Sequence, residues 1–83
     1  MLTIYIKDEC PYCAAVLHKA DELSLAMEHK NIKDDAVVDE LIAKGGKRQV
    51  PYLIDDEHNV SMYESADIVE YLERTYGKAA EAV

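Results

Sequence analysis

The sequence predicts an α/β domain in which a four-stranded mixed sheet is flanked by three helices. The chain has 83 residues, a length at which one domain is the usual outcome, so residues 1–83 are treated as a single domain. Hydrophobic residues make up 49% of it, enough for one modest core. Apolar residues follow strand-like and helix-like spacings in the order β-α-β-α-β-β-α.

The first part of the chain predicts a strand, a helix and a second strand. Residues 2–6 (LTIYI) alternate as a strand does, and apolar residues recur at helical spacing over 11–23. Residues 24–30 are predicted to form a short strand, because Leu25 and Met27 alternate with polar neighbours. A strand-helix-strand unit of this kind is expected to be parallel and right-handed.

A second helix is predicted over residues 34–46. Two acidic residues stand at its start, and Lys44 and Gly45 stand at its end, as the helix dipole and the usual C-cap favour. Its inward-facing stripe is predicted to consist of Val37, Val38, Leu41 and Ile42.

The remainder predicts a hairpin and a closing helix. Residues 50–54 and 59–63 are apolar runs on either side of a polar turn, which favours two antiparallel strands. The helix is predicted over 65–77, with Ser65 as N-cap and Asp67 in the first turn.

The charge balance limits the classes of partner. The chain has 17 acidic and 9 basic residues and a net charge of −8, which argues against nucleic acid. No apolar run approaches the roughly 18 residues of a membrane span, so no membrane association is expected. The N-terminal MLTIYIKDEC lacks the features of a secretory signal, so we expect a cytoplasmic protein, in which permanent disulfides are rare.

Cys10 and Cys13 are the only cysteines, and they stand at the predicted start of the first helix. Pro11 suits the first helical turn, and the free amides there favour a thiolate at Cys10. Lys7 adds a positive neighbour. Cys13 lies three residues further along the same face, where its sulfur can reach that of Cys10. A Cys-x-x-Cys after the first strand of such a pattern is typical of thioredoxin-like redox proteins.

Three other uses of the cysteines are compatible with their number. A zinc site needs four ligands, but His18, His29 and His58 are scattered and fit no ligand spacing. A structural disulfide across so short a loop would constrain the unfolded chain little. Two plain core cysteines remain an alternative, although Pro11 favours a helix-start site.

The sequence resembles the dithiol glutaredoxins in three blocks that together span essentially the whole chain. Cys10-Pro11-Tyr12-Cys13 after a strand resembles their active site, GKRQVPYLI at 46–54 resembles the segment with their Val-Pro, and YESADIVEYL at 63–72 resembles their last helix. The resemblance implies a thioredoxin-like fold, glutathione as reducing co-substrate, and no bound cofactor or metal.

The resemblance also implies how glutathione would bind. The Val50–Pro51 bond would be cis, with the Val50 backbone pairing with the backbone of glutathione. Lys7 and Arg48 would hold the glycine carboxylate. Tyr12 would pack against the edge of the ligand.

The γ-glutamyl end is assigned to the start of the last helix. Ser65 and the open amides there would hold the carboxylate, and Glu64 or Asp67 would accept the ammonium. Simple helix capping by Ser65 and Asp67 explains the same spacing equally well.

Two positions depart from the glutaredoxin pattern. Gln49 stands where glutaredoxins usually have Thr, and Tyr63-Glu64-Ser65 replaces a common Gly-Gly pair. The Glu-Ser pair resembles the glutathione-binding turn in the N-terminal domain of glutathione transferases. Transferase activity itself is not expected, because that family adds a helical domain and this sequence stops at Val83.

These observations predict a glutathione-dependent thiol-disulfide oxidoreductase active in cell redox homeostasis and electron transport. Cys10 is the nucleophile, Cys13 resolves, and the two form a redox-active disulfide. The expected partners are glutathione and client proteins that carry a disulfide or a glutathionyl group, and the enzyme is expected to be a monomer. The alternatives are a glutathione-ligated [2Fe–2S] scaffold or carrier, against which Pro11 argues, and a glutathione-gated interaction domain without turnover.

Overall fold

The computed structural model describes residues 2–77. Its elements follow the predicted order, with a π-helical turn, η1, added at the end. They are β1 (Leu2–Ile6), α1 (Pro11–Glu22), β2 (Met27–Asn31), α2 (Asp35–Gly45), β3 (Tyr52–Asp55), β4 (Val60–Met62), α3 (Ser65–Leu72) and η1 (Glu73–Gly77).

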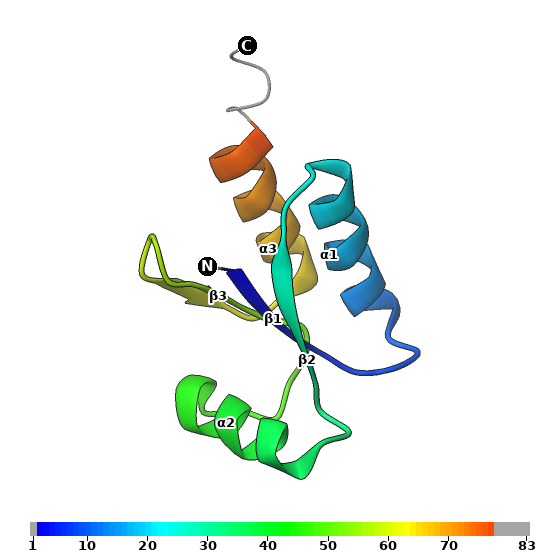
Figure 1. Cartoon of the computed structure of the whole chain (residues 1–83), viewed down its shortest axis with the longest axis vertical. Helices are drawn as coiled ribbons and strands as arrows, with labels where there is room; N and C mark the ends of the chain where they lie inside the picture. Colours follow the sequence, from blue (N-terminus) through cyan, green and yellow to red (C-terminus); the bar gives the residue numbers. More distant parts are fainter. Residues whose placement is uncertain (1, 78–83) are drawn as a thin grey trace.

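The four strands form one mixed sheet in the order β2-β1-β3-β4 (Figure 1). β1 is parallel to β2 and antiparallel to β3, and β3 is antiparallel to β4. The parallel first half and antiparallel second half confirm the predicted thioredoxin-like fold class.

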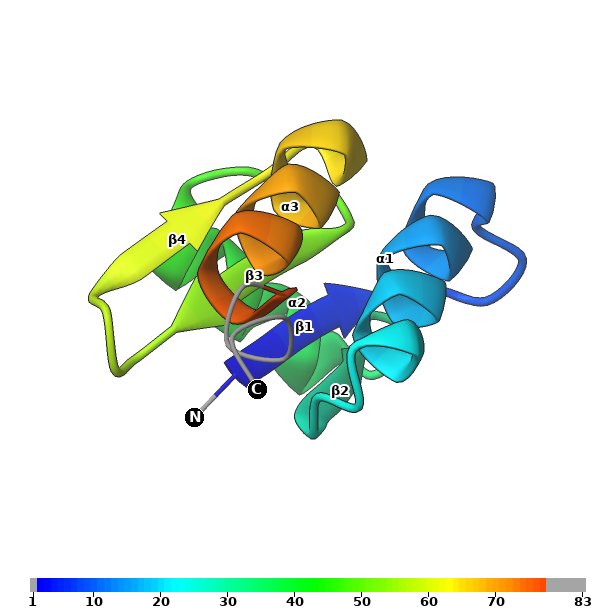
Figure 2. The same cartoon turned by 90° about the horizontal axis from the view of Figure 1, so that it is seen from above.

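Helices cover both faces of the sheet. Figure 2 shows α1 and α3 side by side on one face, with α2 behind the sheet. Ile4 and Leu53 pack toward α1 and α3, whereas Tyr5 and Tyr52 pack toward α2. β1 and β3 are therefore buried on both sides, which matches their near-continuous apolar sequence. Within residues 2–77, no helix is both long and apolar enough to cross a bilayer.

Several details of the predicted elements were wrong, among them the strand of residues 50–54, which is Tyr52–Asp55 in the structure. β2 begins at Met27 rather than at residue 24, because the amides of residues 23–25 bond to carbonyls in the last turn of α1 and Ser24 takes a left-handed conformation. Ile42 is not part of the inner stripe of α2, since its side chain is 43% exposed. The N-cap of α3 is Glu64 rather than Ser65, which occupies the first helical position.

A buried carboxylate joins the hairpin to the end of the last helix. Asp55 is 0% exposed and accepts hydrogen bonds from the hydroxyls of Tyr71 and Tyr76, both at 2.6 Å, while its Oδ2 lies 2.8 Å from His58 Nδ1. Burial opposes the charge, but these bonds together lower the pKa of Asp55 to about 2. The same arrangement, through burial and the bond to Asp55, raises the pKa of Tyr71 to about 12.

This network predicts a pH-dependent contribution of Asp55 to stability. Its folded pKa lies below the unfolded value of 3.8, so the stabilisation is present above pH 4 and is lost as the pH falls toward 2. The contribution amounts to about 2 kcal/mol. Asp55→Asn should lower the free energy of unfolding at pH 7 by about 2–4 kcal/mol, because buried donors lose their charged acceptor.

Urea unfolding at pH 7 and at pH 3 measures both effects. Asp56→Asn is the matched control, because Asp56 is the adjacent acidic residue and is exposed. If the two variants unfolded at the same urea concentration, the assigned role of the Asp55 network would be wrong.

Candidate functional site

The antiparallel register brings three separate segments to one end of the sheet. Tyr5 lies opposite Tyr52, and Leu53 lies opposite Met62. The chain leaving β1, the chain entering β3 and the chain leaving β4 are therefore neighbours. These are the segments that carry the cysteine pair, the Val-Pro pair and the Glu-Ser pair.

Cys10 is the N-cap of α1. Its sulfur accepts a hydrogen bond from the backbone amide of Cys13, with an N···S distance of 3.2 Å, and Pro11 is the first helical residue. Cys10 and Cys13 are both free thiols. The predicted helix-start geometry is confirmed, and the amide stabilises negative charge on the Cys10 sulfur.

The Cys13 thiol occupies a different environment. Its residue is 2% exposed, compared with 8% for Cys10. Burial, followed by the hydrogen bond with Cys10, raises the pKa of the Cys13 thiol to about 11. At neutral pH, Cys13 is therefore held as the protonated thiol, which is a poor first nucleophile.

Two grooves flank the helix start. The first, which we call the cis-proline groove, has a volume of about 450 Å³ and is named for the cis peptide bond between Val50 and Pro51, which confirms the expected isomer. Its lining consists of Tyr12, Gln49, Val50, Pro51, Glu64, Ser65 and Ala66. The second, the cysteine groove, is about 430 Å³, and its lining includes Lys7, Cys10, Cys13 and Leu17.

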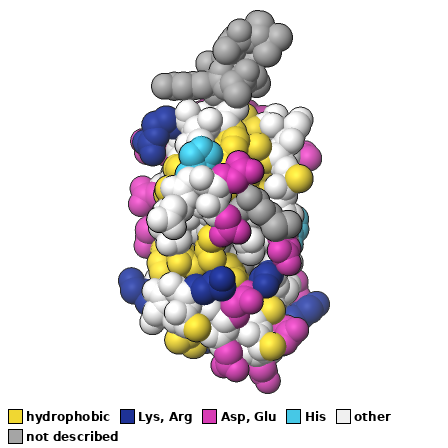
Figure 3. All heavy atoms as spheres, turned by 60° about the vertical axis from the view of Figure 1, so that its left-hand side comes forward, with side chains coloured by type: hydrophobic (Ala, Val, Ile, Leu, Met, Phe, Trp, Pro, Cys, Tyr) yellow, Lys and Arg dark blue, Asp and Glu magenta, His cyan; other side chains and the backbone are white. Residues whose placement is uncertain are grey.

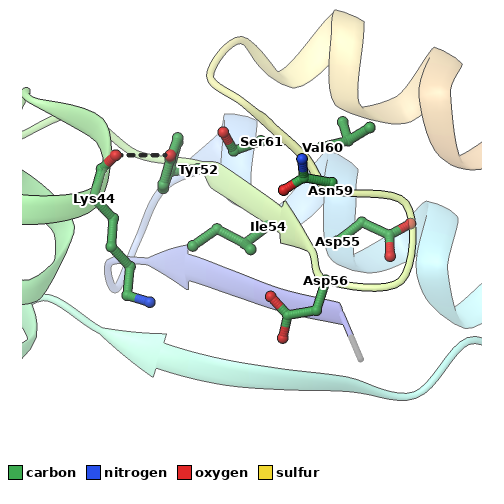
Figure 4. Close-up of a pocket in the computed structure, with 8 residues that line it drawn as sticks. All are labelled: Lys44, Tyr52, Ile54, Asp55, Asp56, Asn59, Val60 and Ser61. Carbon is green, nitrogen blue, oxygen red and sulfur yellow. Dashed lines mark hydrogen bonds between the residues drawn. The ribbon is translucent and has the colours of Figure 1, made fainter.

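Two of the predicted glutathione contacts lie outside both grooves. Arg48 is exposed on the loop before β3 and lines neither groove. Asp67 belongs to a shallow hollow on the outer side of α3, with Glu70 and Arg74. Lys44, another basic residue of the same region, reaches a hollow of about 220 Å³ between α2 and the hairpin, away from the cysteines (Figure 4).

Gln49 is a groove residue that sequence reasoning treated only as a departure from a pattern. Its side-chain amide donates to the Glu64 carboxylate at 3.3 Å, across the cis-proline groove. Glu64 has a φ of 66°, an uncommon conformation for a residue other than glycine. Its side chain makes no capping bond to α3, so it remains available to the groove. The position of Gln49 directly before Val50 was the signal that could have identified it.

Basic side chains are concentrated locally despite the net charge of −8. On the face shown in Figure 3, most Lys and Arg side chains form a band near the end of the molecule built by α2, while acidic side chains occupy much of the remaining surface. In the described part of the chain, no group of three or more His, Cys, Asp or Glu residues could hold a metal ion.

Comparison with known proteins gives a consistent picture. The model of the glutathione S-transferase N-terminal domain family matches residues 4–80. No curated protein sequence matches the chain significantly.

Solved structures of glutathione S-transferases have the same fold. An epsilon-class enzyme from the housefly Musca domestica shares 28% identity with a TM-score of 0.78, over 94% of this chain and 36% of its own. Transferase E6 from Drosophila melanogaster shares 29%, with a TM-score of 0.76, over 92% and 35%. An enzyme from the Antarctic clam Laternula elliptica shares 27%, with a TM-score of 0.78, over 93% and 36%. The chain thus spans about a third of the length of these relatives.

The two thiols are expected to differ in reactivity toward iodoacetamide. At pH 7, the Cys10→Ser variant, which retains only Cys13, should be alkylated at least about tenfold more slowly than Cys13→Ser, because only the thiolate reacts. Its rate should rise about tenfold per pH unit from pH 7 to 9, since the pKa of Cys13 lies well above that range.

Mass spectrometry of quenched samples measures both rates, and the same variants in denaturant are the control. Equal rates in denaturant but not in buffer are the expected pattern. Faster alkylation of Cys13 than of Cys10 in the folded protein would contradict the assignment.

Proposed function

The chain belongs to the family of glutathione S-transferase N-terminal domains, and from this premise we propose that it is a glutathione-dependent thiol-disulfide oxidoreductase. The observation that carries the proposal is the pair of free thiols at the start of α1, beside a groove lined by Val50 and Pro51. A dithiol at this position supplies redox chemistry that a single hydroxyl or thiol would not. A reducing compartment such as the cytoplasm suits a pair of free thiols.

The proposed reaction begins at Cys10. Its thiolate attacks the glutathionyl sulfur of a mixed disulfide, the old S–S bond breaks, and the client leaves as a thiolate that takes up a proton. Cys10 is then joined to glutathione by a new disulfide. A second glutathione thiolate attacks that glutathionyl sulfur, which releases oxidised glutathione and restores the Cys10 thiolate. The net reaction is an exchange: one glutathione thiol is consumed, the client thiol is released, and the glutathionyl group of the substrate leaves within oxidised glutathione.

Cys13 provides a second route for protein disulfides. After Cys10 has bonded to one sulfur of the client, Cys13 loses its proton and attacks Cys10, which closes the Cys10–Cys13 bond and releases the reduced client. Two glutathione molecules then reduce that bond. The high pKa of Cys13 supports this order of events, because a protonated thiol does not compete for the first attack.

The cis-proline groove is the proposed glutathione site. The backbone of Val50 would pair with the peptide backbone of glutathione, with Tyr12 against the edge of the ligand. Ser65 and the first amides of α3 would receive the γ-glutamyl carboxylate, and Glu64 would accept its ammonium. Lys7 and Arg48 remain proposed for the glycine carboxylate. Asp67 lies on the outer side of α3, so Glu64 is the better candidate for the ammonium.

Glutathione transfer to an electrophile is a second candidate function. The family and the solved neighbours favour it, since each of those neighbours is named as a glutathione transferase. The same cis-proline groove would hold glutathione, whose own thiolate would attack the electrophile and displace its leaving group, and the electrophile pocket would have to come from outside the 83 residues. Conjugation of glutathione to an aryl chloride discriminates between the two activities. A [2Fe–2S] role would appear as a brown colour in anaerobically purified protein.

The main test follows reduction of the mixed disulfide between glutathione and 2-mercaptoethanol. Cys10→Ser should lose at least about a hundredfold of the wild-type rate, because the nucleophile is gone. Cys13→Ser should stay within about threefold of wild type on this substrate, since a second glutathione can replace Cys13. The rate of Cys13→Ser should fall further below wild type when the substrate is a protein disulfide, because the second route needs Cys13.

Activity of Cys10→Ser combined with an inactive Cys13→Ser would reverse the two roles. Conjugation of the aryl chloride without any disulfide reduction would favour the transferase.

A further inference from the structure

The cis-proline groove has two walls that come from different parts of the chain. One wall is formed by Gln49, Val50 and Pro51, at the end of the loop that begins at Gly46, and the other is the segment that follows β4, including Glu64 and Ser65. We propose that Tyr63 is a positioning residue that fastens the first wall to the second, and so shapes the groove for glutathione. The inference rests on the proposed function, in which this groove binds glutathione.

The hydroxyl of Tyr63 bonds twice to the backbone of one residue in that loop. It donates to the carbonyl of Lys47 at 3.0 Å and accepts from the amide of Lys47 at 3.2 Å. The Lys47 ammonium also lies 5.5 Å from the centre of the Tyr63 ring. A single side chain thus satisfies both polar backbone groups of a loop residue, which fixes the loop where no strand or helix holds it.

The ring of Tyr63 is itself anchored by a row of aromatic residues. It packs against Tyr52 with a centroid distance of 4.4 Å, and Tyr52 lies 5.8 Å from Tyr5, its partner across β1 and β3. Tyr52 also reaches the last turn of α2, where its hydroxyl lies 3.5 Å from the carbonyl of Lys44 (Figure 4). This row connects β1, β3 and the segment after β4 to the helix that precedes the loop.

Gly45 shows how closely Tyr63 approaches the end of α2. A Cβ added there would lie 2.1 Å from the Tyr63 hydroxyl oxygen and 2.8 Å from its ring carbon. Tyr63 therefore occupies space that only a glycine leaves open. With the ring in place, Gln49 lies where its amide reaches Glu64, which forms a second link between the walls.

Tyr63→Phe tests the proposal because it removes the hydroxyl and keeps the ring stacked on Tyr52. S-methylglutathione, which cannot react, is the calorimetric probe of binding to the whole chain. We expect its dissociation constant to rise about five- to tenfold, the effect of losing one or two hydrogen bonds that hold a groove in shape. The KM for glutathione should rise similarly, with kcat unchanged at saturation. Hydrogen exchange at residues 46–49 should become faster.

Tyr5→Phe is the matched control. It is the same chemical change in the same aromatic row, but the Tyr5 hydroxyl bonds to Glu40, a residue of α2 that does not line the cis-proline groove. Its binding constant should stay within about twofold of wild type. Gly45→Ala should also weaken binding, since it displaces Tyr63, while the helix itself prefers alanine.

The possible outcomes distinguish a failure of the proposed function from a failure of the role assigned to Tyr63. Wild-type protein that does not bind S-methylglutathione would overturn both the proposed function and this inference. Wild-type binding with unchanged affinity and unchanged exchange in Tyr63→Phe would overturn only the role of Tyr63. Weaker binding with faster exchange at 46–49, absent in Tyr5→Phe, supports it. A general loss of stability would instead raise exchange throughout the chain and lower kcat.

Discussion

The antiparallel pairing of β3 with both β1 and β4 is the constraint on which the rest of the structure depends. Because β3 runs opposite to its two neighbours, its first residue lies beside the ends of both. The cysteine turn, the Val50–Pro51 pair and the Glu64 turn therefore meet at one end of the sheet, although they are far apart in the sequence. A parallel β3 would have placed the Val-Pro pair at the opposite end, away from the thiols.

The C-terminal end of β3, at Asp55, stabilises the fold. Asp55 is buried there with its charge, and four groups from the hairpin turn and the C-terminal helical segment bond to its carboxylate. A buried carboxylate in such a setting is costly unless every donor is present, so it fixes the arrangement of these elements. It holds the end of the last helix against the hairpin. Because a helix is stiff, these bonds also help to fix its start, which forms part of the cis-proline groove.

The first turn of α1 gives two chemically identical side chains different surroundings. Cys10 precedes the helix, and its sulfur receives a backbone amide. Cys13 is one turn later and faces the core, where burial keeps its proton on at neutral pH. The division of labour proposed for the two thiols thus follows mainly from their position relative to the helix start. A cysteine at position 12 instead of 13 would not have lain on the same helix face as Cys10.

The sequence by itself determined the element order, the mixed sheet and the cysteine helix start, because hydrophobic periodicity and a Cys-Pro step act locally. It could not place Arg48 or Asp67 outside the grooves, since the direction of an exposed side chain depends on how loops pack. The contact of Gln49 with Glu64 was also decided only by the tertiary structure. It depends on atoms brought together by strand register, which no short stretch of sequence encodes.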